Sequence, residues 1–159
     1  MLTVEVVGIR LELPANQPVL ILRHQESARY LPLWIGTSEA AAISIALEGI
    51  AAPRPLTHDL LADVIKDLGA TLASVSISEL TDGVFFALLN FTSHDAISAR
   101  PSDAVALAIR CGVPIFVNPE VMDAAGMEFS DTDDDSEEDE QEQLEQFRAF
   151  LEEINPEDF

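Results

Sequence analysis

The stretch DAISARPSDAVALAIRCGVPIFV, residues 95–117, decides the predicted fold. Pro101 suits the first turn of a helix, because its missing N–H would have no partner there and its φ is already helical. The apolar residues that follow it predict a buried helix, and Gly112 is placed to end that helix in a left-handed conformation. Ile115-Phe116-Val117 is short and apolar enough to form an inner strand. Asp103, in the first turn, is expected to accept unpaired backbone N–H groups.

The remaining elements follow from alternation, helical spacing and turn residues. Alternating apolar residues predict three strands of an antiparallel meander, at 2–13, 19–22 and 30–35. Thr37 or Ser38 is expected to cap a helix that stops at Gly49, and Thr57 to cap a second helix over 58–68. Asp82-Gly83 predicts a hairpin between strands at 72–80 and 84–92. The second helix carries an apolar stripe that is expected to enter the core, made of Leu60, Leu61, Val64, Ile65 and Leu68.

This order of elements predicts an α+β fold, with a mixed, largely antiparallel β-sheet and helices packed on it. Residues 1–127 are expected to form one domain, because they carry almost all of the predicted elements. Residues 128–142 are nearly all acidic or polar and predict a disordered linker. Residues 143–155 regain helical spacing and predict an amphipathic C-terminal helix. That helix is expected to dock on its own domain, on a second subunit or on another protein.

The net charge of −21 is concentrated in the last part of the chain. Residues 1–127 contain 14 acidic and 7 basic side chains, whereas residues 128–159 contain 15 acidic side chains and 1 basic side chain. Neither part has the basic surface that nucleic-acid-binding proteins usually carry. The charge therefore argues against tight non-specific binding to nucleic acid, but it leaves room for a local pocket or a metal that reverses the local sign.

The composition also predicts the compartment. The apolar runs are broken well short of the ~20 residues that a membrane span needs, so no membrane partner is expected. The chain starts with a strand-like pattern rather than a secretory leader. Its single cysteine, Cys111, excludes an internal disulfide. These observations predict a cytoplasmic protein.

The polar residues at the predicted element ends are the candidates for chemistry. Three acidic residues at three helix starts, Glu39, Asp59 and Asp103, could converge at one end of the sheet. Carboxylates so placed are typical Mg²⁺ or Mn²⁺ ligands and leave positions for water on the metal. Each of these acids could equally well serve only to stabilise its own helix start.

Basic and hydroxyl residues lie beside these acids in the sequence. His58 is the candidate general base or acid, and Arg100 could hold a phosphate through its planar guanidinium. Arg54 and Ser102 are the candidate substrate-binding residues. The ordinary alternatives are a surface role for His58 and an ion pair between Arg100 and a neighbouring acid.

Three motif blocks occur in this order: LPLWIGTSEAAAI (31–43), RPLTHDLLADVIKDLGA (54–70) and the stretch quoted above. Together they resemble the bifunctional nuclease domain family of bacteria and plants, over about residues 1–125. The resemblance implies an α+β fold, action on both RNA and DNA, and a homodimer. The positions that match the family's blocks are Glu39, His58, Asp59, Arg100, Ser102 and Asp103. The acidic linker and terminal helix lie outside that domain and look like an actinobacterial-type extension.

Two functions follow as hypotheses. The first is a nuclease that hydrolyses phosphodiester bonds in RNA and/or DNA with the help of Mg²⁺ or Mn²⁺. In it, His58, Asp59, Arg100 and Asp103 are catalytic, and Glu39, Asp59 and Asp103 hold the metal. The second is a non-catalytic dimeric regulatory or scaffold module, which recruits a protein partner through its acidic tail and terminal helix.

Overall fold

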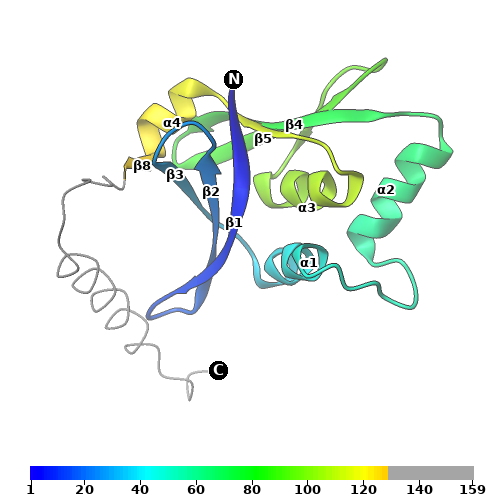
Figure 1. The fold of residues 1–159 in the computed structure, drawn as a ribbon, viewed down its shortest axis with the longest axis horizontal. Helices are drawn as coiled ribbons and strands as arrows, with labels where there is room; N and C mark the ends of the chain where they lie inside the picture. Colours follow the sequence, from blue (N-terminus) through cyan, green and yellow to red (C-terminus); the bar gives the residue numbers. More distant parts are fainter. Residues whose placement is uncertain (129–159) are drawn as a thin grey trace.

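The computed structural model describes residues 1–128 as an α+β domain (Figure 1). Its strands form a single mixed sheet in the order β6-β5-β4-β7-β1-β2-β3-β8. The predicted fold class is therefore confirmed. The elements are β1 (Leu2–Glu12), β2 (Gln17–His24), β3 (Arg29–Trp34), α1 (Thr37–Leu47), α2 (Thr57–Asp67), β4 (Leu72–Thr81), β5 (Val84–Phe91), β6 (Ile97–Ala99), α3 (Pro101–Cys111), β7 (Ile115–Val117), α4 (Pro119–Ala125) and β8 (Met127–Glu128).

The short strand β7 joins the two halves of the sheet. It pairs with β1 in antiparallel fashion and with β4 in parallel fashion, and β4–β7 is the one parallel pair among the described strands. Ile115 and Val117 are buried, which confirms the predicted inner strand. Without β7, the meander β1–β3 and the hairpin β4–β5 would be separate sheets.

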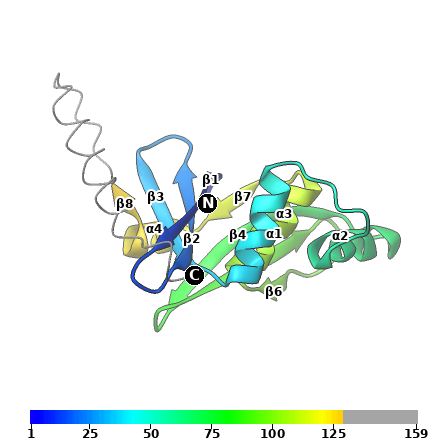
Figure 2. The same cartoon turned by 90° about the horizontal axis from the view of Figure 1, so that it is seen from below.

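Helix α3 is the central element of the helical layer. Six of its residues are buried, Ser102 and Ala104 to Ala108. It packs against α1, α2, β4 and β5 (Figure 2). Small alanine side chains let α1 and α3 approach the sheet and each other closely. Gly112 ends α3 with a φ of 65°, as predicted, because a left-handed residue without Cβ satisfies the last carbonyls of a helix.

Helix α2 projects beyond the edge of the sheet, at the end of the molecule away from β1–β3 (Figures 1 and 2). It has no fully buried residue. Its predicted core stripe is wrong for four residues, Leu60, Leu61, Val64 and Leu68, whose exposed fractions are 53%, 37%, 42% and 82%. Ile65, by contrast, packs against the core. Helix α2 is amphipathic, as its stripe predicts, but within residues 1–128 α3 is the one element that contacts it extensively. Most of the apolar face of α2 therefore has no cover within these residues.

Two helix starts differ from the prediction by one position. Gly36 and Leu56 are the N-caps of α1 and α2, in place of the predicted threonines or serine. The predicted hairpin turn is confirmed, because Asp82 and Gly83 both adopt positive φ, 52° and 77°. Strands β6 and β8 were not predicted, since three and two residues are too short for an alternating pattern.

The predicted linker and C-terminal helix lie outside the described residues, apart from Glu128. That residue pairs with Arg29 at the end of the sheet, as part of β8.

Candidate functional site

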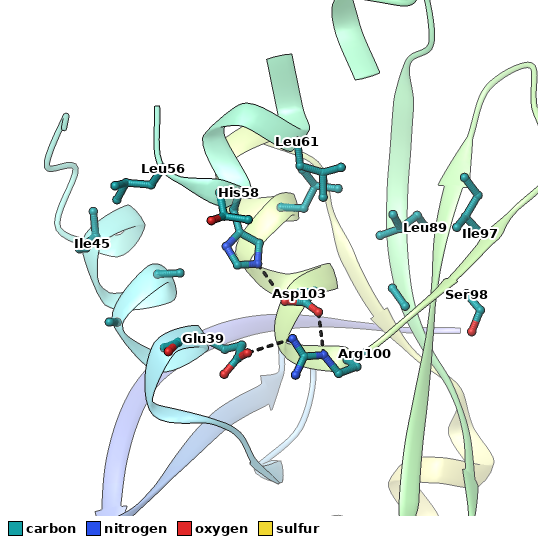
Figure 3. A pocket seen from close by; sticks show the side chains of 16 residues that line it. Glu39, Ile45, Leu56, His58, Leu61, Leu89, Ile97, Ser98, Arg100 and Asp103 are labelled. Carbon is teal, nitrogen blue, oxygen red and sulfur yellow. Dashed lines mark hydrogen bonds and ion pairs between the residues drawn. The ribbon is translucent and has the colours of Figure 1, made fainter. Parts of the chain in front are cut away.

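The N-terminal ends of three helices meet around one pocket (Figure 3). Glu39 comes from the first turn of α1, His58 from the first turn of α2, and Asp103 from the first turn of α3. Arg100 is the N-cap residue of α3 and follows β6 directly. These four residues are called the His58 cluster below. The pocket that they border has a volume of about 690 Å³.

Hydrogen bonds connect the His58 cluster in a chain. His58 Nε2 lies 2.9 Å from Asp103 Oδ1. Arg100 donates from Nε to the other oxygen, Asp103 Oδ2, at 2.8 Å, and from Nη2 to Glu39 Oε1 at 2.9 Å. Figure 3 shows Arg100 between Glu39 and Asp103, and Asp103 between Arg100 and His58. Residues 39, 58, 100 and 103 are thus brought together, as the sequence predicted.

The tautomer of His58 follows from its partner. An ionised carboxylate can only accept, so Nε2 carries the proton that Asp103 Oδ1 accepts. Nδ1 has no hydrogen-bond partner within residues 1–128. In the neutral ring, Nδ1 is therefore the nitrogen that can take up a proton.

The structure corrects the predicted role of Asp103. The N-terminus of α3 has no side-chain cap. Asp103 is hydrogen-bonded instead to the side chains of His58 and Arg100. The capping role belongs instead to Asp59, whose Oδ2 accepts from the backbone N–H of Leu56 at 3.0 Å. The other oxygen of Asp59 accepts from Arg110 Nε at 2.6 Å.

The other predicted site residues lie apart from the His58 cluster. Asp59 does not line the pocket, because its carboxylate is directed to Arg110. Ser102 is buried and borders a second pocket, which Arg100 also borders. Arg54 lies in the loop between α1 and α2 and borders neither of these two pockets.

The predicted metal ligands do not converge. Glu39 and Asp103 approach each other through Arg100, while Asp59 is held by a different arginine. Within residues 1–128, no group of three or more His, Cys, Asp or Glu side chains is placed to hold a metal ion. In this arrangement a guanidinium occupies the place between the two carboxylates where a cation would bind, and the residues do not fit a three-carboxylate metal site. The use of Mg²⁺ or Mn²⁺ stays a prediction.

Most of the remaining lining of the pocket is apolar. Its wall carries Leu56 and Leu61 from the α2 side, Ile45 from α1, and Leu89 and Ile97 from the sheet (Figure 3). A concave apolar surface with a few convergent polar groups at one side is the usual form of a ligand site. The His58 cluster supplies those polar groups.

Residues 20–130 match the family model described as the bifunctional nuclease domain. The match covers more than half of the chain. The chain belongs to the bifunctional nuclease domain family. An uncharacterized protein of Mycobacterium tuberculosis is 49% identical to it over 158 residues, which span 98% of this chain and 96% of that protein.

Plant relatives carry the family's name. Bifunctional nuclease 1 of Oryza sativa subsp. japonica is 26% identical over 120 residues, and bifunctional nuclease 1 of Arabidopsis thaliana is 23% identical over 120 residues. Both alignments span 71% of this chain but only 36% and 37% of the plant proteins. The bifunctional nuclease domain described here thus corresponds to about a third of each plant protein. The family suggests nuclease activity and nucleic-acid binding at the level of the domain.

The ionisation of the bifunctional nuclease domain's acids follows from their partners. Burial acts to raise the pKa of Asp103, but the hydrogen bonds from His58 and Arg100 outweigh it and leave that pKa below its ordinary value. Backbone hydrogen bonding and Arg100 lower the pKa of Glu39. Asp103 and then Glu39 raise the pKa of Arg100. With three charged residues, the His58 cluster carries one net negative charge when His58 is neutral and none when His58 is protonated.

Arg110 is a residue beside the site whose contacts the sequence did not predict. Its side chain is only 7% exposed. It donates to Asp59 of α2, to the carbonyl of Ala42 in α1 at 3.1 Å, and to the carbonyl of Ala106 in α3 at 3.0 Å. One guanidinium thus fixes the three helices whose first turns carry the His58 cluster. The sequence shows Arg110 only as a cation in the last turn of an apolar helix. Its favourable interaction with the helix dipole already explains a cation at that position, so nothing pointed to the three helices.

The Asp59–Arg110 pair predicts a pH-dependent stability difference. Arg110 and then the Leu56 N–H lower the folded-state pKa of Asp59 below its ordinary value of 3.8. The pair therefore stabilises the fold above about pH 4, and this contribution is lost as the pH falls through the lower folded-state pKa. Asp59→Asn should cost about 0.5–1 kcal/mol of unfolding free energy at pH 7, because the carboxylate is 36% exposed and solvent screens the pair.

Urea unfolding of wild type and Asp59→Asn at pH 7, 5 and 3 would test this prediction. The difference between the two midpoints should be constant from pH 7 to 5 and should shrink by pH 3. Asp63→Asn is the control, because Asp63 lies on the same helix and forms no ion pair within the described part of the chain. A difference that stays unchanged at pH 3 would contradict the prediction.

Proposed function

We propose that this domain hydrolyses phosphodiester bonds in RNA and/or DNA. The observation that carries the proposal is the chain of hydrogen bonds from His58 through Asp103 to Arg100 at the side of an apolar pocket. A histidine oriented by a carboxylate is a common general base or acid. A guanidinium beside it suits a phosphate, because its planar N–H groups match two phosphate oxygens.

The proposed steps use residues of this chain only. Neutral His58 accepts a proton from water at Nδ1, and the water oxygen forms a bond to phosphorus. The bond from phosphorus to the leaving oxygen breaks, and that oxygen takes a proton from the imidazolium. Asp103 holds the ring in orientation and stabilises its charged form, since His58 Nε2 stays hydrogen-bonded to Asp103 throughout.

Arg100 would hold the phosphate while it stays bonded to the cluster. A guanidinium has five N–H donors, and two of them are used by Asp103 and Glu39. Three donors remain for phosphate oxygens, and the Arg100 side chain is 65% exposed. Glu39 and Asp103 therefore serve as positioning residues that fix the plane of the guanidinium.

The experiment is a cleavage assay with stringently purified full-length protein on single-stranded RNA and single-stranded DNA. Wild type should cleave in Mg²⁺ or Mn²⁺, and reactions in EDTA show whether either metal assists. Asp103→Asn should lower kcat about 10- to 100-fold, because an amide can hold the ring but cannot stabilise its charged form. Equal activity of both proteins under all conditions would assign the cleavage to a contaminant and would favour the scaffold alternative.

A specific observation favours a homodimer, which we propose as the second feature of the function. Leu60 and Val64 on α2 and Leu68 at its C-cap follow one another at intervals of four, and all three are exposed. An apolar stripe of this kind is typical of helix pairing. A second copy of α2, packed against the first, would cover it.

Analytical ultracentrifugation tests the dimer. Val64→Glu should shift the wild-type dimer towards monomer, because it places a charge in the paired stripe. Val7→Glu is the matched control, since Val7 is a valine of similar exposure on β1. A wild-type monomer at micromolar concentration would reject the proposal and would leave the stripe to a different protein partner.

No helix within residues 1–128 has the length and apolar character required to cross a membrane. The cytoplasmic location expected from the sequence stays a prediction, and cell fractionation would test it. The protein partner expected for residues 143–155 likewise stays a prediction, because that segment lies outside the described residues.

A further inference from the structure

A second pocket adjoins the His58 cluster and has no role in the proposed chemistry. Its volume is about 460 Å³. Its walls come from three places: the end of β3 with the residues that follow it, the β4–β5 hairpin, and the start of α3. The residues that matter for the argument are Trp34, Gly36, Val84, Phe85 and Arg100.

Arg100 belongs to both pockets. It borders the first pocket together with His58 and Asp103, and it borders the second together with Trp34 and Ser102. Arg100, whose guanidinium has three N–H donors left over, therefore borders two cavities. A ligand that placed an anionic group on Arg100 could extend an arm into each cavity.

Trp34 offers a flat apolar surface in the second pocket. Its side chain is 56% exposed although it lies at the end of a sheet strand. The indole N–H donates to the carboxylate of Glu12 on β1, so the one polar atom of the ring is already satisfied. What remains for a ligand is the ring face. Exposed tryptophan faces next to a cation are typical platforms for unpaired bases.

We propose that the second pocket is a base-binding subsite for single-stranded RNA or DNA. The strand lies across Arg100 with a phosphate on the guanidinium, one base enters the apolar first pocket, and the neighbouring base stacks on Trp34. This inference rests on the proposed function and names the form of its substrate. Paired bases cannot use the two cavities, because their faces are covered by neighbouring base pairs in a duplex.

The subsite also accounts for recognition without a basic surface. Residues 1–127 carry a net charge of −7, so phosphate attraction alone is weak. Base stacking contributes about 1–3 kcal/mol per base and depends little on base identity. Two cavities on either side of one arginine would therefore bind a short strand by its bases, with little preference among sequences.

Trp34 provides its own probe, because it is the only tryptophan of the chain. Full-length protein is titrated with the oligonucleotides dT6 and rU6 in EDTA, so that cleavage is suppressed if a metal is required, and with a matched 12-base-pair duplex. Stacking on Trp34 should quench its fluorescence with single strands and leave it unchanged with the duplex. His58→Ala keeps Trp34 and Arg100 and should show the same quenching, with cleavage about 10²–10⁴-fold slower than in wild type. Equal quenching by duplex, or no quenching during binding seen by fluorescence anisotropy of a labelled strand, would overturn the proposal.

A second measurement separates the subsite from the catalytic proposal. Trp34→Ala should raise KM for dT6 about tenfold, as expected for the loss of one stacked base, with kcat changed less than twofold. The ratio of kcat/KM for dT6 to that for the small ester bis(4-nitrophenyl) phosphate should fall by the same factor. Ile50→Ala is the control, because Ile50 is 56% exposed, as Trp34 is, and borders neither pocket. An unchanged KM would overturn the subsite while leaving the proposed function in place.

If wild type cleaves nothing, the proposed function fails and the binding titration still decides the subsite. Labelled dT6 should then bind Trp34→Ala about tenfold more weakly than wild type. Wild-type Trp34 fluorescence that changes with protein concentration alone would show that a second copy covers the pocket, and this result would also overturn the proposal.

Discussion

Replacing His58 with alanine is expected to lower kcat for phosphodiester hydrolysis by about 10²–10⁴-fold, the range typical of a lost general acid or base. The reason lies in the geometry. The imidazole of His58 can accept a proton on one ring nitrogen and give it back, and Asp103 holds the other nitrogen at 2.9 Å. KM should change little, because Arg100 and the apolar wall remain in place. Steady-state kinetics on single-stranded RNA and DNA would measure both constants.

His24→Ala is the matched control for this prediction. His24 also bonds to a side chain, that of Ser27 at 2.7 Å, but it lies at the end of β2 and borders neither pocket. It should retain wild-type kcat. If His58→Ala kept more than a tenth of the wild-type kcat, the acid–base role would have to be abandoned, and the scaffold alternative would gain support.

The largest effect on stability is expected from Arg110→Met. The substitution keeps an apolar stem of similar length but removes the hydrogen bonds to Asp59, Ala42 and Ala106. The three lost hydrogen bonds, one of them to a carboxylate, together cost about 3–5 kcal/mol. The partial exposure of Asp59 reduces this to about 2–3 kcal/mol, which corresponds to a fall in Tm on the order of 10 °C. Calorimetry and urea unfolding would measure the loss.

The same variant tests whether Arg110 positions the site. Because Arg110 connects α1, α2 and α3, its removal should lower kcat even at a temperature where the variant is fully folded. Arg110→Lys should not restore stability, since an ammonium cannot bond to three acceptors in the planar arrangement of a guanidinium. Arg54→Met is the control, because Arg54 is exposed and forms no ion pair within residues 1–128. Equal Tm values for Arg110→Met and Arg54→Met would contradict the prediction.

Much of the candidate site could be predicted from the sequence. Residues 39, 58 and 103 each stand in a first turn, and helices packed on one side of a sheet often bring such ends together. The roles could not be predicted, because Asp59 and Asp103 are the same residue type at the same third position of their helices. One caps its helix and binds Arg110, whereas the other binds His58 and Arg100. Two partners make this difference, Arg110 for Asp59 and His58 for Asp103. Each lies more than 40 positions along the chain from its acid.

The sequence by itself determined the α+β class, the inner strand Ile115–Val117, the left-handed Gly112 and the Asp82-Gly83 hairpin. Each of these depends on local stereochemistry: a fixed proline φ, a residue without Cβ, or the alternation of apolar side chains. The outward direction of most of the α2 stripe and the position of Arg100 at the border of two cavities could be learned only from the folded structure. Burial and side-chain partnership depend on which distant elements meet, and the apolar period of a helix carries no information about what lies opposite it.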